Sequence, residues 1–186
     1  GADVKFVAAD LLSQAEHDPM ASAILLSDRA ELIENVNVEL KKQTEVLSKK
    51  EIVEQSLKDY GKSILCESIS DCIRFANAIA PEHLELCVSD PMRYLDEVKN
   101  AGSVFLGYYT CESIGDYFGG TNHVLPTSGT ARFSSALGVD AFVKKTSFLH
   151  YTKEALDAYG KYIAVMAEEE QLQAHANAVK VRVSDE

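Results

Sequence analysis

Four of the five histidines of this chain, all but His150, lie beside side chains that can bind a metal or move a proton, or in an unusual loop. The first expected helix ends in Gln14-Ala15-Glu16-His17, and the i,i+3 spacing places Gln14 and His17 on one face. An amide oxygen and an imidazole placed in this way can share one metal ion. The simpler interpretation is a solvated helix end, where the helix dipole favours His17. The spacing by itself leaves both interpretations open.

A carboxylate and an imidazole stand together in Glu82-His83, directly after Pro81 and at the start of an expected strand. Such a pair suits proton transfer, because imidazole exchanges protons near neutral pH and a carboxylate can activate water. In α/β proteins ligands bind at an edge of the sheet, and this pair is expected at such an edge. Adjacent strand residues point to opposite faces, however, so a purely structural role fits the pattern equally well.

The segment GDYFGGTNHVLPTSGTARFSS at 115–135 has no helix or strand period and is rich in Gly, Ser and Thr. Loops this long inside a compact domain are mostly functional or disordered. Its candidate metal or substrate contacts are Asp116 and His123. Further hydrogen-bonding groups come from Asn122, Thr127, Ser128, Thr130 and Arg132. The apolar residues expected to hold the loop down are Tyr117, Phe118, Val124, Leu125 and Phe133. A self-bonded surface loop is the alternative interpretation.

Near the end of the chain, the acidic run Glu168-Glu169-Glu170 and the single His175 fall on an expected helix. A charge run of this kind is usually a solvated helix face. A lone helical histidine is more often exposed than bound to a ligand. From the residues alone, this segment predicts a surface helix.

The composition restricts the class of protein. With 46% apolar and 25% charged residues, the chain falls within the range of ordinary globular domains. Its 18 basic and 29 acidic residues give a net charge of −11, which repels phosphate backbones and anionic lipids. Neither nucleic acid nor a membrane surface is therefore an expected partner. No apolar run is long enough to span a bilayer and no signal peptide opens the chain, so a cytoplasmic location is expected.

Several common site chemistries find no support in the sequence. The four cysteines form no CxxC pair and are expected to be reduced, buried thiols: Cys66, Cys72, Cys87 and Cys111. The patterns GxGxxG, GxxxxGK[ST], HExxH and GxSxG are all absent. The sequence thus favours neither a phosphate-binding loop, nor a zincin site, nor an esterase nucleophile.

Helical and strand periods alternate along the first part of the chain. This alternation predicts crossover connections and a mostly parallel sheet with flanking helices, the α/β class. Helices are predicted at 4–16, 29–48, 51–60, 68–78 and 92–100, and strands at 23–26, 63–66, 84–88 and 103–106. Later helices are predicted at 152–166 and 168–178, with an extended end at 179–183. We therefore expect an α/β domain at 1–135 and a C-terminal helical tail at 136–186.

Four segments together resemble the C-terminal part of the histidinol dehydrogenase family. They are DLLSQAEHDP (10–19), ANAIAPEHLEL (76–86), AGSVFLGYYTCESIGDYFGGTNHVLPTSGTARFSS (101–135) and EEEQLQAHANAVKVR (168–182). The resemblance covers essentially the whole chain and implies a Rossmann-like half. It further implies a zinc-dependent homodimer of histidine biosynthesis. Its members oxidise the small molecule L-histidinol through L-histidinal to L-histidine, with two molecules of NAD⁺.

The resemblance also implies a set of zinc ligands. By motif, these correspond to Gln14, His17, Asp116 and His175, all of which would also contact the substrate. Such a set contains nitrogen and oxygen donors and no thiolate, which leaves the cysteines without a role at the metal. The tail would serve dimerisation, and the 1–135 domain would hold zinc and substrate.

Catalytic and substrate roles follow from the same resemblance. His83 corresponds to the base for the alcohol and later for the hydrated aldehyde, and Glu82 to the group that activates water. Both His123 and Glu170 correspond to substrate contacts. In this family the terminal segment reaches the partner subunit, so His175 and Glu170 would complete the neighbour's site.

Length is the main departure from the family. Its members are more than twice as long, and this chain opens with Gly1-Ala2 instead of Met, so a fragment is expected. Contacts to NAD are expected mainly in the half that would precede Gly1, and the fragment alone is expected to be inactive. One alternative is a non-catalytic metal-binding or dimerisation module of the same fold. Another is a metal-assisted hydrolase in which Glu82 activates water.

Overall fold

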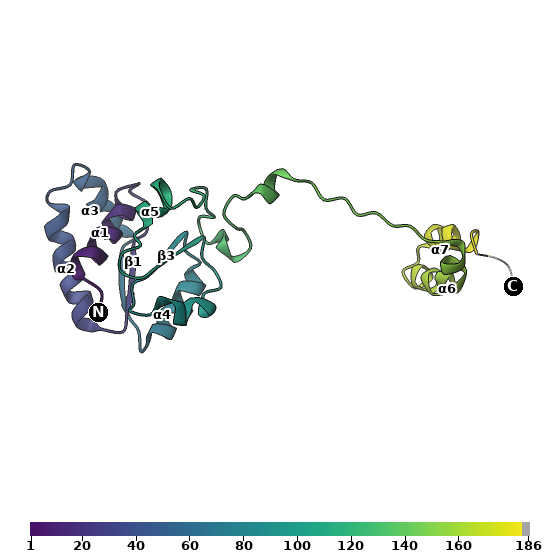
Figure 1. The fold of residues 1–186 in the computed structure, drawn as a ribbon, viewed down its shortest axis with the longest axis horizontal. Coiled ribbons are helices and arrows are strands. Elements are labelled where there is room, and N and C mark those ends of the chain that lie inside the picture. The colour runs from purple at the N-terminus through teal and green to yellow at the C-terminus, as the bar shows by residue number, and fades with distance from the viewer. Residues whose placement is uncertain (184–186) are drawn as a thin grey trace. The chain divides into compact units, whose positions relative to one another are not determined.

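The structure is a computed structural model that describes residues 1–183. The chain forms two compact units, Gly1–Phe142 and a second that begins at Val143 (Figure 1). The functional division predicted after residue 135 stays a prediction. Within residues 1–183, no helix combines the length and the apolar character that a bilayer crossing requires.

The first unit alternates helices and strands as the periodicity predicts. Its elements are α1 (Val4–Ala15), β1 (Ile24–Ser27), α2 (Ala30–Thr44), α3 (Lys50–Asp59), β2 (Lys62–Leu65), α4 (Ile69–Ile79), β3 (His83–Leu86), η1 (Pro91–Glu97), β4 (Ser103–Leu106), α5 (Glu112–Tyr117), η2 (Thr130–Arg132) and η3 (Val139–Phe142). The five helices and four strands predicted before residue 107 all fall on observed elements, with ends that differ by a few residues.

Pairing between the strands is parallel, as the crossover pattern predicts. β1 pairs with β2 so that Leu25 lies opposite Ser63, and β3 pairs with β4 so that Glu85 lies opposite Phe105. These are two separate two-stranded sheets, β1-β2 and β3-β4, where a single sheet was expected. The α/β class with flanking helices is confirmed.

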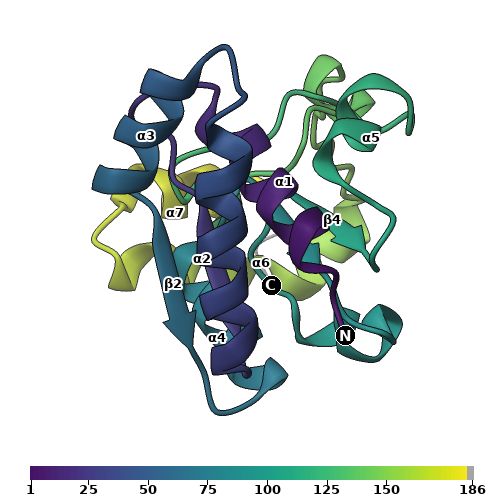
Figure 2. The same ribbon diagram turned by 90° about the vertical axis from the view of Figure 1, so that its left-hand side faces the viewer.

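The core lies between the first helices and β1. Val7 and Ala8 on α1, Leu25 on β1 and Val36 on α2 form one buried cluster, which fixes α1 and α2 against β1. Figure 1 shows α1 and α2 on one side of β1 and α4 on the other, and Figure 2 shows α2 running beside α1. This packing holds the end of α1, which carries Gln14, close to the start of β3.

Two predictions between residues 91 and 135 are wrong in detail. The helix predicted at 92–100 is a 3₁₀ helix that ends at Glu97, with Pro91 in its first turn. The segment 115–135 is not free of helix, because α5 occupies its first part and η2 spans Thr130–Arg132. Glycine lowers the helical signal, which is why α5, with Gly115 inside it, escaped the sequence analysis.

Four of the five apolar residues expected to hold the long loop down are exposed, and Leu125 is half-buried. Phe118 is 94% exposed, Tyr117 84% and Phe133 82%. Polar contacts close the loop on itself and against α4 instead. The Thr130 hydroxyl donates to the Thr127 carbonyl, and the Arg132 guanidinium donates to the Ala78 carbonyl.

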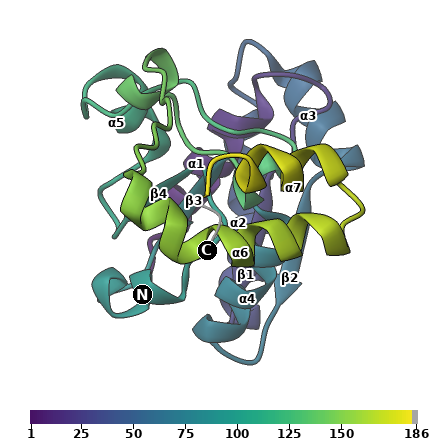
Figure 3. The same cartoon turned by 90° about the vertical axis from the view of Figure 1, so that its right-hand side faces the viewer.

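The second unit is a helical hairpin of α6 (Lys153–Glu169) and α7 (Gln173–Lys180), drawn in Figure 3. Buried Gly160 lets the helices approach, because a Cβ there would lie 3.1 Å from Val179 Cγ1. The two helices predicted here are confirmed. The extended segment predicted from Val179 is wrong, since α7 runs to Lys180 and the Val181 N–H donates to the Asn177 carbonyl at 3.1 Å.

Candidate metal and catalytic site

His83 opens β3 directly after a helix end that the sequence encodes. α4 stops at Ile79, Ala80 adopts a left-handed conformation (φ 55°), and Pro81 follows. Proline disfavours helix in the residue before it, so the chain turns out of α4 and into the strand here. The His83 side chain is 15% exposed and its ring packs on Phe105, with 5.9 Å between ring centroids. His83 therefore lies at the amino end of β3, whereas α/β sheets usually bind ligands at the carboxyl ends.

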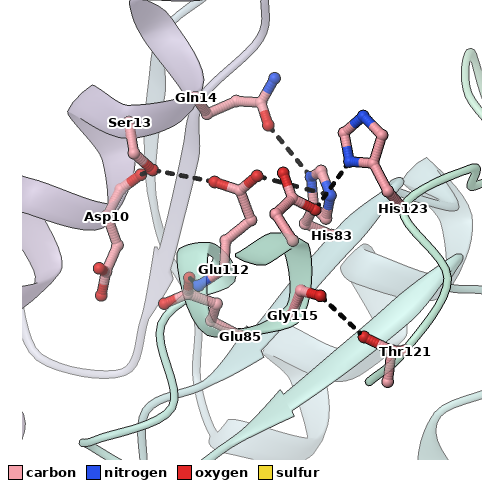
Figure 4. Close-up of polar contacts among 10 residues, drawn as sticks. Asp10, Ser13, Gln14, His83, Glu85, Glu112, Gly115, Thr121 and His123 are labelled. Atoms are coloured by element: carbon pink, nitrogen blue, oxygen red, sulfur yellow. Dashed lines mark hydrogen bonds and ion pairs between the residues drawn. The ribbon is translucent and has the colours of Figure 1, made fainter. Parts of the chain in front are cut away.

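Gln14 and Glu112 flank the His83 ring (Figure 4). His83 Nδ1 lies 3.2 Å from Gln14 Oε1, and Nε2 lies 3.8 Å from Glu112 Oε1. In the tautomer that carries its proton on Nδ1, the ring donates to Gln14 and leaves Nε2 able to accept a proton. This arrangement suits a general base held in one orientation.

Glu112 is a site residue that the sequence analysis missed. It is 6% exposed, and its Oε2 accepts a hydrogen bond from the Ser13 hydroxyl at 3.2 Å. Its backbone N–H donates to Glu85 Oε1 at 3.1 Å, which secures the first turn of α5. The available signal was the i,i+4 spacing of Glu112 and Asp116, which places both carboxylates on one helix face.

Asp116 and His123 form an ion pair at the open side of this cluster. Asp116 Oδ1 lies 2.9 Å from His123 Nδ1; the aspartate side chain is 9% exposed and the histidine 72%. The hydrogen bond from His123 lowers the pKa of Asp116, and the same bond raises the pKa of His123. The pair holds a charged carboxylate beside the His83 ring.

Three of these side chains could hold a metal ion. One donor atom each from His83, Glu112 and Asp116 lies within 4.8 Å of the others. Nitrogen and carboxylate oxygen donors suit zinc, and the Gln14 oxygen adjoins the same ring. The residues present therefore fit a borderline divalent cation such as the zinc that the resemblance implies.

The structure brings two of the four predicted ligands to this cluster. Gln14 and Asp116 both lie there. His17 follows α1 in a tight turn closed by its N–H bond to the Gln14 carbonyl at 3.4 Å, and it is exposed. No hydrogen bond or ion pair among residues 1–183 joins the His17 ring to the cluster. His175 is exposed on α7, in the second unit.

The remaining predicted site residues lie in different places. Glu82 is half-buried, and its charge contributes to the raised pKa of His123. Its backbone carbonyl accepts the Ser103 N–H at 2.8 Å. Glu170 is exposed at the end of α6, in the second unit.

A second acidic cluster lies behind Glu112. Donor atoms of Asp10, Glu85 and Cys87 lie within 4.8 Å of one another. Burial and the neighbouring Asp10 carboxyl raise the pKa of Glu85 to about 8. Burial also raises the pKa of the Cys87 thiol to about 12, so this sulfur stays protonated and is a poor nucleophile. All four cysteines are free, with Cys66 and Cys72 buried, as predicted, and Cys87 and Cys111 half-buried.

Known proteins resemble this chain over nearly its full length. The chain is 55% identical to the histidinol dehydrogenase of Clostridium acetobutylicum over 178 residues, which are 96% of this chain and 41% of that relative. It is also 55% identical to the enzyme of Caldanaerobacter subterraneus subsp. tengcongensis over 181 residues, 97% of this chain and 42% of the relative. The crystal structure of histidinol dehydrogenase from Elizabethkingia anophelis superposes with a TM-score of 0.88 at 45% identity, covering 97% of this chain and 42% of that one.

The chain thus spans about two-fifths of the length of the curated relatives it matches. A family model described as histidinol dehydrogenase matches residues 1–183, nearly the full sequence. On this evidence, the chain belongs to the histidinol dehydrogenase family.

Proposed function

We propose that this chain is the zinc- and substrate-binding part of an enzyme that oxidises L-histidinol through L-histidinal to L-histidine with two NAD⁺. The observation that carries the proposal is the cluster around His83. There Gln14, Glu112 and the Asp116–His123 pair surround one imidazole. These groups come from α1, β3, α5 and the long loop, so tertiary folding gathers four separate segments at one point.

Zinc would be held by Gln14 and Asp116, with His17 from the turn after α1 and His175 of a second copy completing the set. His83, although it could itself bind a metal, would serve as the base. When bound, zinc would supply a Lewis acid that orients the imidazole and amine of the substrate, and NAD⁺ would accept the hydride. Support for this assignment comes from the Gln14 amide oxygen, 3.2 Å from His83 Nδ1, and from the Asp116 carboxylate, within 4.8 Å of a ring nitrogen of His83. Contacts to NAD are expected mainly in the part of the relatives that this chain does not match.

The chain's own residues would move the protons. His83 Nε2 would take the proton from the substrate hydroxyl, and later from the hydrated aldehyde, while Gln14 holds Nδ1. Glu82 would activate the water that adds to the aldehyde. His123 and Glu170 would bind the substrate, the latter from the partner subunit. Tail residues reaching a second copy make the proposed working form a homodimer.

Calorimetric titration of zinc, followed by L-histidinol with and without zinc, tests this proposal. We expect zinc-dependent histidinol binding that Asp116→Asn weakens by at least ~10–100-fold, since even outer-shell changes at metal sites cost this much. Asp140→Asn is the matched control, because Asp140 is an exposed aspartate on η3. Zinc binding without any histidinol affinity would favour the non-catalytic module or the hydrolase and would contradict the proposal.

A further inference from the structure

Glu85 shares one face of β3 with His83. Successive side chains of a strand point to opposite faces, so residues two apart point the same way. Both of these side chains contact α5 at the same residue. His83 Nε2 lies 3.8 Å from Glu112 Oε1, and Glu85 Oε1 accepts a hydrogen bond from the Glu112 backbone N–H at 3.1 Å (Figure 4). The strand that carries the base therefore contacts Glu112 at both its side chain and its backbone.

Little in the sequence of α5 supports a helix. It has six residues and contains Gly115, and helices this short are not stable by themselves in water. The N–H groups of a first helical turn have no partner inside the helix. In the described chain, Cys111, which precedes α5, bonds none of them through its side chain. The neighbouring strand, through Glu85, supplies the acceptor that α5 lacks in its own sequence.

Other contacts hold the Glu85 carboxyl in place. It hydrogen-bonds the Asp10 carboxyl on α1, and the Cys87 thiol donates to Glu85 Oε2 at 3.8 Å. Donor atoms of the three side chains lie within 4.8 Å of one another. One carboxyl group on β3 thus links α5 to α1, the helix that carries Gln14.

The Glu85 bond acts on more of the site than the Ser13 bond does. The Ser13 hydroxyl donates to Glu112 Oε2 at 3.2 Å and so fixes that carboxylate only. Glu85 instead fixes the backbone of the first residue of α5, and Asp116 lies one turn further along on the same face. Movement of the first turn would therefore displace both carboxylates, each of which has an oxygen within 4.8 Å of a ring nitrogen of His83.

We propose that Glu85 is a positioning residue of the site. Its hydrogen bond to the Glu112 N–H holds the first turn of α5 against β3, and this keeps the carboxylates of Glu112 and Asp116 beside His83. Glu85 contacts neither substrate nor metal in this scheme and acts through α5. Its effect on metal binding rests on the proposed function, whereas its effect on the position of α5 does not.

NMR on the 186-residue chain without zinc tests the position of α5. Gly115 lies against the Phe105 ring, since a Cβ there would be 2.8 Å from Phe105 Cε1, so its α protons should show a nuclear Overhauser effect (NOE) to that ring. Glu85→Ala should abolish this NOE and speed the exchange of the Glu112 amide at least ~10-fold. Glu85→Gln should retain the NOE and the slow exchange, because glutamine has the same length and keeps an oxygen that accepts the N–H.

Zinc calorimetry on the same variants tests the consequence for the metal. Substitutions outside the ligand set of a metal site cost roughly 10–100-fold in affinity, and we expect Glu85→Ala to weaken zinc binding by about this factor. Glu85→Gln should stay within ~3-fold of the unaltered chain, since its acceptor is preserved. Leu86→Ala is the matched control, because Leu86 is buried on the opposite face of β3. It should lower the melting temperature and leave the NOE and the zinc affinity unchanged.

A second variant, Glu85→Val, keeps the test decisive if Glu85→Ala does not fold. Valine suits a half-buried strand position, and its side chain has no acceptor for the Glu112 N–H. Glu85→Val should therefore lose the NOE and weaken zinc binding as Glu85→Ala does.

Three results would overturn the proposal. The first is an intact NOE, or an unchanged zinc affinity, in Glu85→Ala and Glu85→Val. The second is a Glu85→Gln variant that behaves like Glu85→Ala, because the acceptor oxygen would then not be what holds α5. The third is loss of the NOE in Leu86→Ala, which would reduce the effect to general destabilisation. Absence of zinc binding by the unaltered chain would contradict the proposed function alone, because the NOE and exchange measurements would still decide whether Glu85 positions α5.

Discussion

Gly115 lies in α5 between the two carboxylates of the site, and its lack of a side chain sets how close this helix comes to β4. A Cβ at this position would lie 2.8 Å from Phe105 Cε1 and 3.1 Å from Cζ. Phe105 is buried and packs against His83. Gly115→Ala must therefore displace either the Phe105 ring or the helix that carries Asp116.

Two opposing effects determine how much Gly115→Ala changes the stability of the protein. Overpacking costs roughly 1–3 kcal/mol, and alanine in place of glycine inside a helix returns about 1 kcal/mol. The 2.8 Å approach to a buried ring puts the overpacking cost at about 2–3 kcal/mol. We therefore expect a net loss of about 1–2 kcal/mol, which lowers the melting temperature by roughly 2–8 °C. Gly138→Ala is the control, because its Cβ would meet only the movable Asp140 side chain and should change stability by less than ~0.5 kcal/mol.

Thermal unfolding and zinc calorimetry on the same variants complete the test. Gly115→Ala should weaken zinc binding as well as stability, since it moves Asp116. Phe105→Leu removes the contacting ring atoms, so in that background Gly115→Ala should cost little or should stabilise the protein. A Gly115→Ala variant as stable as the wild type, with unchanged zinc affinity, would refute the packing argument.

Three further predictions concern the charges of the site. Because the pKa of Glu85 is raised to about 8 from 4.5, the stability that this carboxyl contributes is present below pH 4.5 and is lost as the pH rises to 8. In urea unfolding at pH 5 and pH 8, Glu85→Gln should lose less free energy of unfolding between the two pH values than the unaltered chain does. An equal loss in both proteins would contradict this prediction. Ser13→Ala removes the hydrogen bond that the Ser13 hydroxyl donates to buried Glu112, and should lower the free energy of unfolding in urea by about 1–3 kcal/mol. No change in that free energy would show that other partners satisfy the Glu112 carboxylate. Asp116→Asn should lower the pKa of His123 in an NMR titration, since Asp116 raises it; an unchanged value would show that the pair does not form in solution.

Much of the local structure could be predicted from the sequence. Helix ends depend on residues close by in the sequence. Pro81, for example, follows the end of α4, so that Glu82 and His83 lie at the start of a strand. The alternation of helical and strand periods predicted parallel pairing of the strands. Parallel neighbours need a long crossover connection, usually a helix, whereas antiparallel neighbours can be joined by a two-residue turn. The i,i+3 spacing pointed to Gln14 and His17, and the polar groups of the long loop pointed to Asp116 and His123. Gln14, Asp116 and His123 do lie around His83, whereas His17 is exposed.

The failures have a common cause. Glu112 belongs to no motif in the sequence. It lies in the site because its carboxylate accepts a hydrogen bond from Ser13, which is 99 residues away in the chain. The apolar residues of the long loop were expected to be buried, but burial depends on whether a surface lies opposite, and Phe118 and Phe133 find none within the first unit.

By itself, then, the sequence determined most of the helices and strands before residue 107, to within a few residues, and which residue types were available for chemistry, since these depend on contacts a few residues apart. Tertiary structure alone decided that the strands form two separate pairs, and that one imidazole sits between the amide of α1 and the carboxylates of α5. Such distances are set by the packing of helices on strands, and no spacing along the chain encodes them.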